Sequence, residues 1–158
     1  WFGRLATCRR RATILPLGAS WTEHDGPSHR VAGAGEVSSW IYDPDPALLR
    51  SGLLDGFAVS HALSRCAWGV DYLTSEVRVE SPFLAAFEVL DVVSPDLKIL
   101  KRLVAKHAIG ILEIKTRGVD LTPETLRARI RPEGPHSATL LLYGGQGPAR
   151  AVLARRPV

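Results

Sequence analysis

The residues best placed for chemistry are basic side chains in the last third of the chain. Lys98, Arg102 and Lys106 follow one another at intervals of four residues, Lys101 lies among them, and no acidic residue interrupts the row. Residues four apart lie on the same face of a helix, so this spacing predicts a stripe of one charge sign. Such a stripe can bind phosphate groups, because Lys and Arg neutralise them. Alternatively, it is a solvated outer face on which Lys106 also complements the helix dipole.

A second basic group is expected on the strand that follows this helix. Alternation places Glu113, Lys115 and Arg117 on one side of that strand and apolar residues on the other. Tyr143 is the one aromatic residue expected near this surface, so base stacking should contribute little to binding. Together the two elements predict a nucleic-acid-binding surface made of Lys98, Lys101, Arg102, Lys115 and Arg117.

The charge distribution supports an anionic partner for the same region. The whole chain of 158 residues has a formal net charge of +4, but residues 98–158 hold twelve Lys or Arg against four acidic residues. The preceding stretch, residues 36–97, is acidic, with ten acids against three Arg. This asymmetry indicates that the last third meets something anionic and that the middle faces solvent or a basic neighbour.

Two glycine-rich motifs do not support a catalytic role. Gly33-Ala34-Gly35 has Ser38 where a dinucleotide loop needs a third glycine, and no strand leads into a helix there, which favours a linker. Gly144-Gly145-Gln146 matches the tripeptide of peptide-release factors, yet it lies between two strand-like runs, where glycines are typical of a hairpin turn. We therefore expect no cofactor loop in this chain.

The histidines and cysteines lack the spacing of a metal or nucleophile site. His24 and His29 have neither helical spacing nor a nearby Cys, so surface histidines are favoured over a metal site. His61 and His107 occupy helix positions where a half-buried imidazole is expected. Cys8 and Cys66 are far apart, which indicates reduced structural thiols. The sequence thus predicts no catalytic and no metal-ligating residue.

The elements that must position the basic residues follow from local signals. Residues 10–15 and a short segment near Trp21 predict an edge hairpin, and residues 24–39 read as a linker. Asp45 and Pro46 begin a helix as N-cap and first helical residue, and Gly52 and Gly56 weaken it unless another backbone packs closely there.

The remaining elements alternate between strand and helix. Strands are expected over residues 87–93 and 111–116, helices over residues 97–109 and 123–131, and a terminal hairpin over residues 138–155. The order is β-α-β-α-β-β, preceded by a helical segment. It predicts an α+β fold with a mixed, mostly parallel sheet, in which the hairpin forms an antiparallel edge.

Several strings of residues resemble one family. Tyr42-Asp43-Pro44-Asp45-Pro46, Tyr72-Leu73-Thr74, Ser81-Pro82-Phe83 and Glu113-Ile114-Lys115 look, in this order, like the THUMP-like domain at the C-terminus of certain bacterial class I methyltransferases. Arg9-Arg10-Arg11-Ala12-Thr13 is similar to the last strands of the preceding methyltransferase domain. The family's usual basic string has a second lysine where this chain has Thr116.

The resemblance implies a division at residue 39 and a larger enzyme. Residues 1–39 would be the end of a Rossmann-like methyltransferase domain with its linker, and residues 40–158 a THUMP-like domain. S-adenosylmethionine would be bound by the upstream domain and not by this chain, and RNA would be the substrate class. A start at Trp1-Phe2 and the lack of any Met also favour a fragment.

Two functions from different classes stay open, and a third is disfavoured. The chain either positions an RNA substrate for the methyltransferase or is a structural, protein-interaction module that completes that domain or a dimer. A small stand-alone enzyme is disfavoured, because no acid/base or nucleophile arrangement exists. No apolar run is long enough for a membrane span and no signal peptide is evident, so a cytoplasmic location is expected. The oligomeric state is left open.

Overall fold

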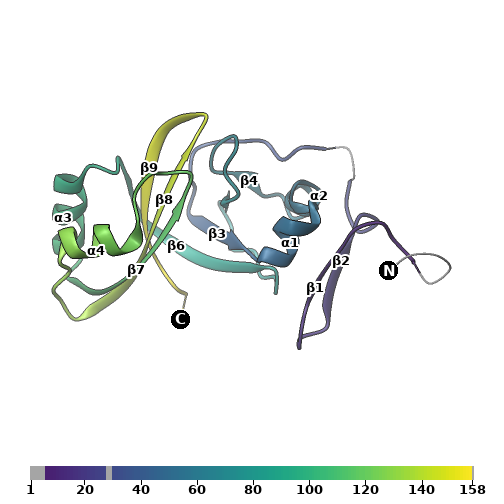
Figure 1. Cartoon of the computed structure of the whole chain (residues 1–158), viewed down its shortest axis with the longest axis horizontal. Helices are drawn as coiled ribbons and strands as arrows, with labels where there is room; N and C mark the ends of the chain where they lie inside the picture. The colour runs from purple at the N-terminus through teal and green to yellow at the C-terminus, as the bar shows by residue number, and fades with distance from the viewer. Residues whose placement is uncertain (1–5, 28–29, 158) are drawn as a thin grey trace.

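The computed structural model describes residues 6–27 and 30–157 of the chain. In this part of the chain a small two-stranded sheet and a seven-stranded sheet are combined with four helices. Two of the helices lie at one end of the molecule, beside the large sheet, and the two-stranded hairpin lies at the other end (Figure 1). None of the described helices has the length and apolar character needed to cross a bilayer.

The N-terminal hairpin packs against the first two helices. Its strands are β1 (Arg11–Ile14) and β2 (Ala19–Thr22), which pair antiparallel. Ala12 of β1 is buried, and Trp21 of β2 meets the ring of Phe57 edge-on, with 5.0 Å between ring centroids. The predicted hairpin is therefore confirmed, and it shares a hydrophobic cluster with the helices that follow.

The linker-like segment is partly held in place by backbone hydrogen bonds. Arg65 N–H donates to the Gly33 carbonyl at 2.7 Å, and Gly35 N–H donates to the Arg65 carbonyl at 3.0 Å. Gly33 to Gly35 thus run as extended chain beside Arg65, in agreement with the rejection of a dinucleotide loop.

The single helix expected after Asp45 is two short helices, α1 (Pro46–Ser51) and α2 (Leu54–Ser60). The predicted start is confirmed, since the Asp45 carboxylate accepts a hydrogen bond from Ala47 N–H at 2.7 Å and Pro46 is the first helical residue. Gly52 ends α1 because it takes a left-handed conformation, with φ at 68°. Gly56 lies within α2, where the backbone of Pro27 packs closely against it.

The seven-stranded sheet has the order β4-β5-β3-β6-β9-β8-β7. Its strands are β3 (Trp40–Pro44), β4 (Ser64–Arg65), β5 (Leu73–Ser75), β6 (Leu84–Val93), β7 (Ile109–Arg117), β8 (His136–Gly145) and β9 (Gly147–Arg155). The first three were not predicted as strands. The helices α3 (Leu97–Lys106) and α4 (Pro123–Ile130) connect β6 to β7 and β7 to β8. The α+β class is confirmed, and the elements from β6 on follow one another along the chain as β6, α3, β7, α4, β8 and β9.

The expectation of a mostly parallel sheet with the hairpin at its edge is wrong. Among the paired strands of this sheet, β7 and β8 alone run parallel. The last strand, β9, inserts between β6 and β8, so strands joined through helices are not all neighbours. The reason is burial, because Ala151 to Ala154 are fully buried and a strand that is apolar on both faces needs an interior position.

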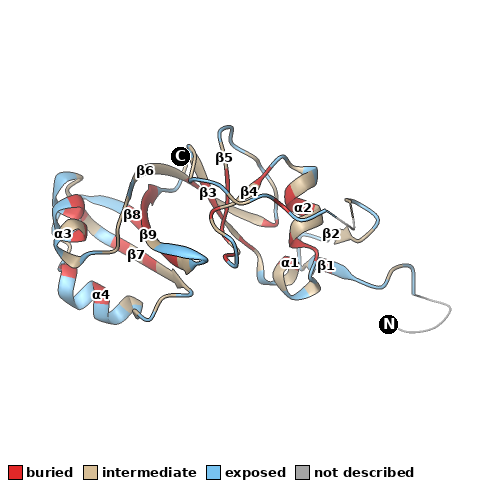
Figure 2. Ribbon diagram, turned by 90° about the horizontal axis from the view of Figure 1, so that it is seen from above, coloured by how far each residue is buried: buried red, intermediate tan, exposed pale blue. Residues whose placement is uncertain are grey.

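Each face of the large sheet carries its own core. On one face, α3 and α4 cover a cluster that includes Leu100, Leu112 and Leu140. On the other face, Tyr72, Cys66 and neighbouring residues cover a second cluster on β6, β8 and β9. Figure 2 shows the buried residues concentrated along these central strands, while the helices expose their outer sides.

Candidate nucleic-acid interface

Helix α3 exposes three of the five predicted basic residues. Leu100, Leu103 and Val104 form its buried face, which leaves the predicted basic row on the outer side. On the outer side the structure exposes Lys98, Lys101 and Arg102. Asp96 caps the helix by accepting from Lys98 N–H at 2.9 Å and Ile99 N–H at 3.1 Å. These capping hydrogen bonds therefore fix the start of the helix that carries the exposed stripe.

The α3 stripe has no acidic partner within ion-pair distance among the described residues. Lys106, at the end of the same row, differs, because its Nζ atom lies 3.1 Å from Asp91 Oδ2. His107 also contacts that oxygen, through Nε2 at 2.7 Å. The hydrogen bond from His107, followed by that from Lys106, lowers the pKa of Asp91 against the opposing effect of burial.

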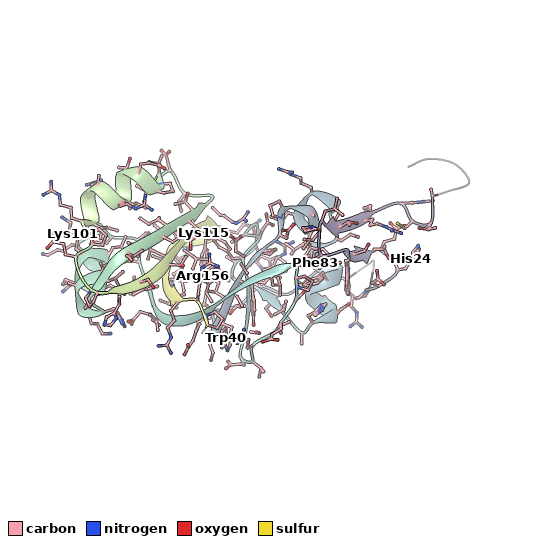
Figure 3. The ribbon with its side chains drawn as sticks, turned by 90° about the horizontal axis from the view of Figure 1, so that it is seen from below. His24, Trp40, Phe83, Lys101, Lys115 and Arg156 are labelled. Carbon is pink, nitrogen blue, oxygen red and sulfur yellow. The ribbon has the colours of Figure 1, made fainter. Side chains whose placement is uncertain are left out.

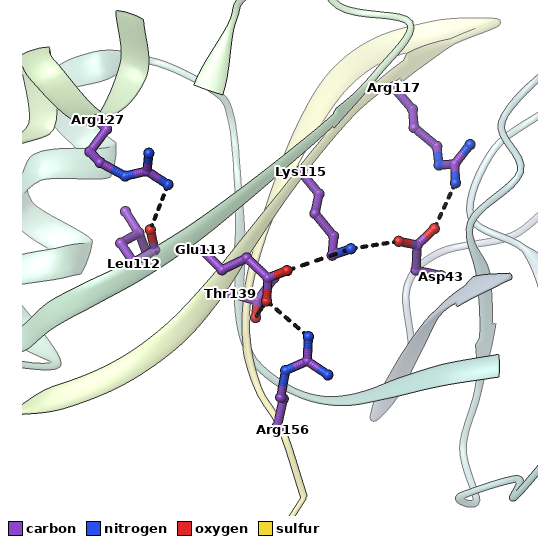
Figure 4. A network of polar contacts seen from close by, with 8 residues as sticks. All are labelled: Asp43, Leu112, Glu113, Lys115, Arg117, Arg127, Thr139 and Arg156. Carbon is purple, nitrogen blue, oxygen red and sulfur yellow. Dashed lines mark hydrogen bonds and ion pairs between the residues drawn. The ribbon is translucent and has the colours of Figure 1, made fainter. Parts of the chain in front are cut away.

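The two predicted basic residues on β7 lie on the opposite face of the sheet. Lys115 Nζ donates to Asp43 Oδ2 at 2.9 Å, and Arg117 Nη2 donates to Asp43 Oδ1 at 2.7 Å (Figure 4). The Arg117 guanidinium also lies 5.0 Å from the centre of the Tyr72 ring. Burial disfavours the charged form of Arg117 and so lowers its pKa. The hydrogen bond to Asp43 and the negative charge of Asp43 outweigh this effect and raise the pKa of Arg117 above its ordinary value.

The predicted surface is thus divided into two groups that the structure does not bring together. Figure 3 shows Lys101 at the α3 end of the molecule, well away from Lys115. Alternation correctly placed Lys115 and Arg117 on the face that does not carry α3, and for that reason they cannot extend the α3 stripe. Instead, the ion pairs that these two residues form with Asp43 connect β7 to β3, although the two strands are not neighbours in the sheet.

A charged network that the sequence did not predict continues from Lys115. Glu113 lies 3.6 Å from Lys115 Nζ and accepts hydrogen bonds from Thr139 Oγ1 and Arg156 Nη2, both at 3.1 Å. The Arg156 guanidinium lies 5.2 Å from the centre of the Phe87 ring. Burial opposes ionisation of Glu113, but the Arg156 hydrogen bond and the Lys115 charge lower its pKa. The only feature of the sequence that pointed to this network was the alternation that placed Glu113 and Lys115 on the same side of the predicted strand.

Removing the Asp43 carboxylate should destabilise the fold. An Asp43→Ala variant leaves two half-buried cations without their anion, and partial exposure lets water compensate only in part. We expect a loss of about 1 to 3 kcal/mol in the free energy of unfolding, measured by urea denaturation. The control is Asp120→Ala at an exposed site, with an expected change within about 0.5 kcal/mol. Equal stability of the two variants would show that the ion pairs contribute nothing.

The remaining candidate residues have structural surroundings. Tyr143 pairs with Arg117 in the β7–β8 register, as expected of a residue near the basic group on β7, but it is only 3% exposed, so its ring offers no free face for base stacking. His61 is half-buried, with Nδ1 2.8 Å from the Phe57 carbonyl oxygen. His24 is exposed 3.9 Å from Glu23, and His29 lies outside the described residues. The Gly144-Gly145-Gln146 motif forms the irregular turn between β8 and β9, as predicted.

Comparisons with known proteins agree with the fold and add a family. Residues 84–156 match the family model described as THUMP domain-like. Two uncharacterized S-adenosylmethionine-dependent methyltransferases of Mycobacterium tuberculosis, from strains CDC 1551 / Oshkosh and ATCC 25618 / H37Rv, are each 33% identical over 134 residues. These alignments cover 85% of this chain and 36% of either relative, so the chain spans about a third of their length.

A solved structure has the same fold. The crystal structure of a "putative methyltransferase" from Porphyromonas gingivalis W83 aligns with a TM-score of 0.72 and 23% identity, over 92% of this chain and 36% of that one. The family match and the names of the sequence relatives both agree with the resemblance to a THUMP-like domain of methyltransferases that the sequence analysis found. Residues 84–156 thus match the THUMP-like family model, in a chain whose sequence relatives are named as S-adenosylmethionine-dependent methyltransferases.

Proposed function

We propose that this chain is the RNA-binding C-terminal part of a cytoplasmic S-adenosylmethionine-dependent methyltransferase. Cofactor binding and catalysis belong, in this proposal, to sequence outside the chain, in the upstream methyltransferase domain. The printed names of the relatives, and the third of their length that this chain spans, support the methyltransferase part of the proposal.

The observation that carries the RNA part is the contrast between the α3 stripe and five nearby basic residues that are paired with carboxylates. Lys106, Lys115, Arg155 and Arg156 each lie within 4 Å of a carboxylate, as does Arg117. The stripe, formed by Lys98, Lys101 and Arg102, is exposed and has no such partner among the described residues. Unpaired cations in a row are the groups that can neutralise successive phosphates of a nucleic-acid backbone.

The test is the salt dependence of RNA binding. The triple variant Lys98→Ala/Lys101→Ala/Arg102→Ala should lower the affinity for a single-stranded or tRNA-like ligand about tenfold or more. Each lost phosphate contact also reduces the slope of log affinity against log salt by about 0.7, so the slope should fall by about 2. Fluorescence anisotropy at several salt concentrations measures both quantities, and none of the three side chains belongs to the buried face of α3.

A charge-matched control separates this effect from net charge. The variant Arg9→Ala/Arg30→Ala/Arg50→Ala removes three exposed cations from the first half of the chain and should keep the slope of the unmodified protein. If the α3 variant also keeps affinity and slope, the stripe is a solvated surface and RNA binding by this helix is wrong.

One observation favours the alternative function, a module that completes the methyltransferase or contacts a protein partner. Leu15 and Leu17, in the turn of the β1–β2 hairpin, are 82% and 70% exposed. Exposed large aliphatic residues at the end of a hairpin are typical of a surface that another domain covers. The two functions are compatible, because the hairpin and α3 lie at opposite ends of the molecule (Figure 1).

A further inference from the structure

The face of the sheet that carries the second core is filled at one end and open at the other. At the filled end, Tyr72 and Cys66 pack on Leu141 and Tyr143 of β8. Two residues earlier along the same face of β8, Thr139 lines an open groove of about 600 Å³. Its volume is within the range of small-molecule sites, about 300 to 1,000 Å³.

The groove combines an apolar wall with hydrogen-bond donors. Ile111 is 72% exposed, although it lies on β7 in the row whose other members, Glu113, Lys115 and Arg117, are charged. Leu90 of β6 provides a second apolar side chain. The polar lining comes from the start of β8, with His136, Ser137 and Thr139, and from the end of β9, with Arg155 and Arg156.

The two arginines are held in position and still have donors available. Arg155 contacts Glu88 through Nε and Nη2, both at 2.8 Å, and Arg156 Nη2 donates to Glu113 at 3.1 Å. A guanidinium has five N–H donors in a fixed plane, so these contacts leave some of them free for an anion. Both side chains are more than half exposed toward solvent. A phosphate that enters the groove therefore meets donors in fixed orientations.

We propose that this groove binds one nucleotide of a single-stranded RNA. In this assignment the phosphate contacts Arg155, Arg156 and His136, the base or ribose packs on Ile111, and Glu113 accepts from a base amino group. An apolar contact beside fixed phosphate donors suits a nucleotide better than a free inorganic anion. The assignment rests on the proposed RNA-binding function and specifies a second part of the site.

The position of the groove supports this assignment. His107, the residue that ends α3, lines the groove, and its neighbour Lys106 closes the basic row of the same helix. A strand whose backbone follows the α3 stripe can thus continue into the groove past Asp91, whose carboxylate is paired with Lys106 and His107. In Figure 3, Lys101 marks the stripe and Arg156 lies on the groove side of the sheet.

The test compares two substitutions at exposed aliphatic residues. Ile111→Glu places a carboxylate in the groove, whereas Val77→Glu makes the same change in charge at a residue that is 76% exposed outside it. Neither side chain is buried, so both variants should unfold at the temperature of the unmodified chain. With an oligouridylate of about ten nucleotides, anisotropy should show at least a fivefold loss of affinity for Ile111→Glu and less than half of that loss for Val77→Glu.

A second measurement uses uridine 5′-monophosphate, uridine and inorganic phosphate as separate probes. The monophosphate should shift the backbone amide resonances of Ile111, Ser137 and Arg156 in a saturable way, and the nucleoside or phosphate alone should do so more weakly. If Ile111→Glu binds RNA like Val77→Glu and the monophosphate leaves these resonances unchanged, the groove proposal is wrong while the α3 stripe can stand. If the monophosphate shifts them but no RNA binds, the RNA-binding function fails and the nucleotide groove stands.

Discussion

Replacing Gly110 by alanine will destabilise the domain by about 3 kcal/mol, the upper end of the range for overpacked substitutions. A Cβ atom at Gly110 would fall on the backbone carbonyl oxygen of Gly134, and a Cβ atom at Gly134 would fall on that of Ala108. The backbone at the start of β7 therefore packs directly against the backbone of the loop that leads into β8, and no side chain fits between them. A hydrogen bond from His136 N–H to the Ala108 carbonyl, at 3.1 Å, holds this contact together.

The steric nature of this effect can be tested with a second glycine. Gly33 has no atom within 4 Å of its ideal Cβ position, so Gly33→Ala should change the free energy of unfolding by less than about 0.5 kcal/mol. Urea denaturation of both variants measures the difference. A Gly110→Ala protein as stable as Gly33→Ala would mean that the two loops can separate without cost. Because this backbone contact lies at the entry to the groove strands, Gly110→Ala should also weaken nucleotide binding.

Helix limits were predictable because their signals are local. Thr122 accepts from Thr125 N–H at 3.2 Å and Pro123 begins α4, as the sequence indicated. Helical spacing likewise placed Lys98 and Arg102 correctly on one exposed face, opposite the buried Leu100 and Val104. In these segments a few neighbouring residues determine both the capping hydrogen bond and the buried face, so no information from distant sequence was needed.

Strand neighbours were not predictable in the same way. β3 was missed because Asp43 and Pro44 lead directly into the helix start at Asp45 and Pro46, and only three residues, Trp40 to Tyr42, precede them with strand character. The insertion of β9 between β6 and β8 depends on the burial of its middle residues on two faces. The alternation of strands and helices gives the direction of β6, β7 and β8, but not the strand that separates them.

The candidate site shows the same limit. The exposed α3 stripe follows from spacing within one helix, and it was predicted. The partner of Lys115 and Arg117 is Asp43, which is 72 and 74 residues away in the sequence. The groove likewise combines residues from α3, β6, β7, β8 and β9, which come together only through the strand order. The groove thus depends on the misassigned part of the topology, which explains why no local sequence pattern predicted it.

The stability of the domain should fall steeply at alkaline pH because of Cys66. Its side chain is 5% exposed in the second core, and burial raises the pKa of the Cys66 thiol from 9.0 to about 12. Below the unfolded pKa the thiol is protonated in both states and has no effect on stability. Above it, the unfolded chain loses the proton first, so the stability is lost as pH rises toward the folded pKa.

The expected loss is large enough to measure. A difference of about three pKa units corresponds to about 4 kcal/mol once pH exceeds about 12, and to about 2 kcal/mol at about pH 10.5. Burial also raises the pKa of Tyr72 and Tyr143, which adds to the loss at the highest pH. Urea denaturation under reducing conditions, from about pH 8 to 10.5, should therefore show a free energy of unfolding that decreases with pH.

Substitution of each cysteine separates the thiol from the tyrosines. Cys66→Ala lowers the stability at neutral pH, because it leaves a small cavity, but it should reduce the decrease between about pH 9 and 10.5 by about 2 kcal/mol. Cys8→Ala should keep the full decrease, since Cys8 is only partly buried. Thiol labelling of the unmodified chain should likewise modify Cys8 rapidly and Cys66 only when the domain unfolds. If Cys66→Ala and Cys8→Ala lose stability equally over this range, ionisation of Cys66 is not the cause. The second core would then admit water to the thiol, which contradicts its packing between Tyr72 and Tyr143.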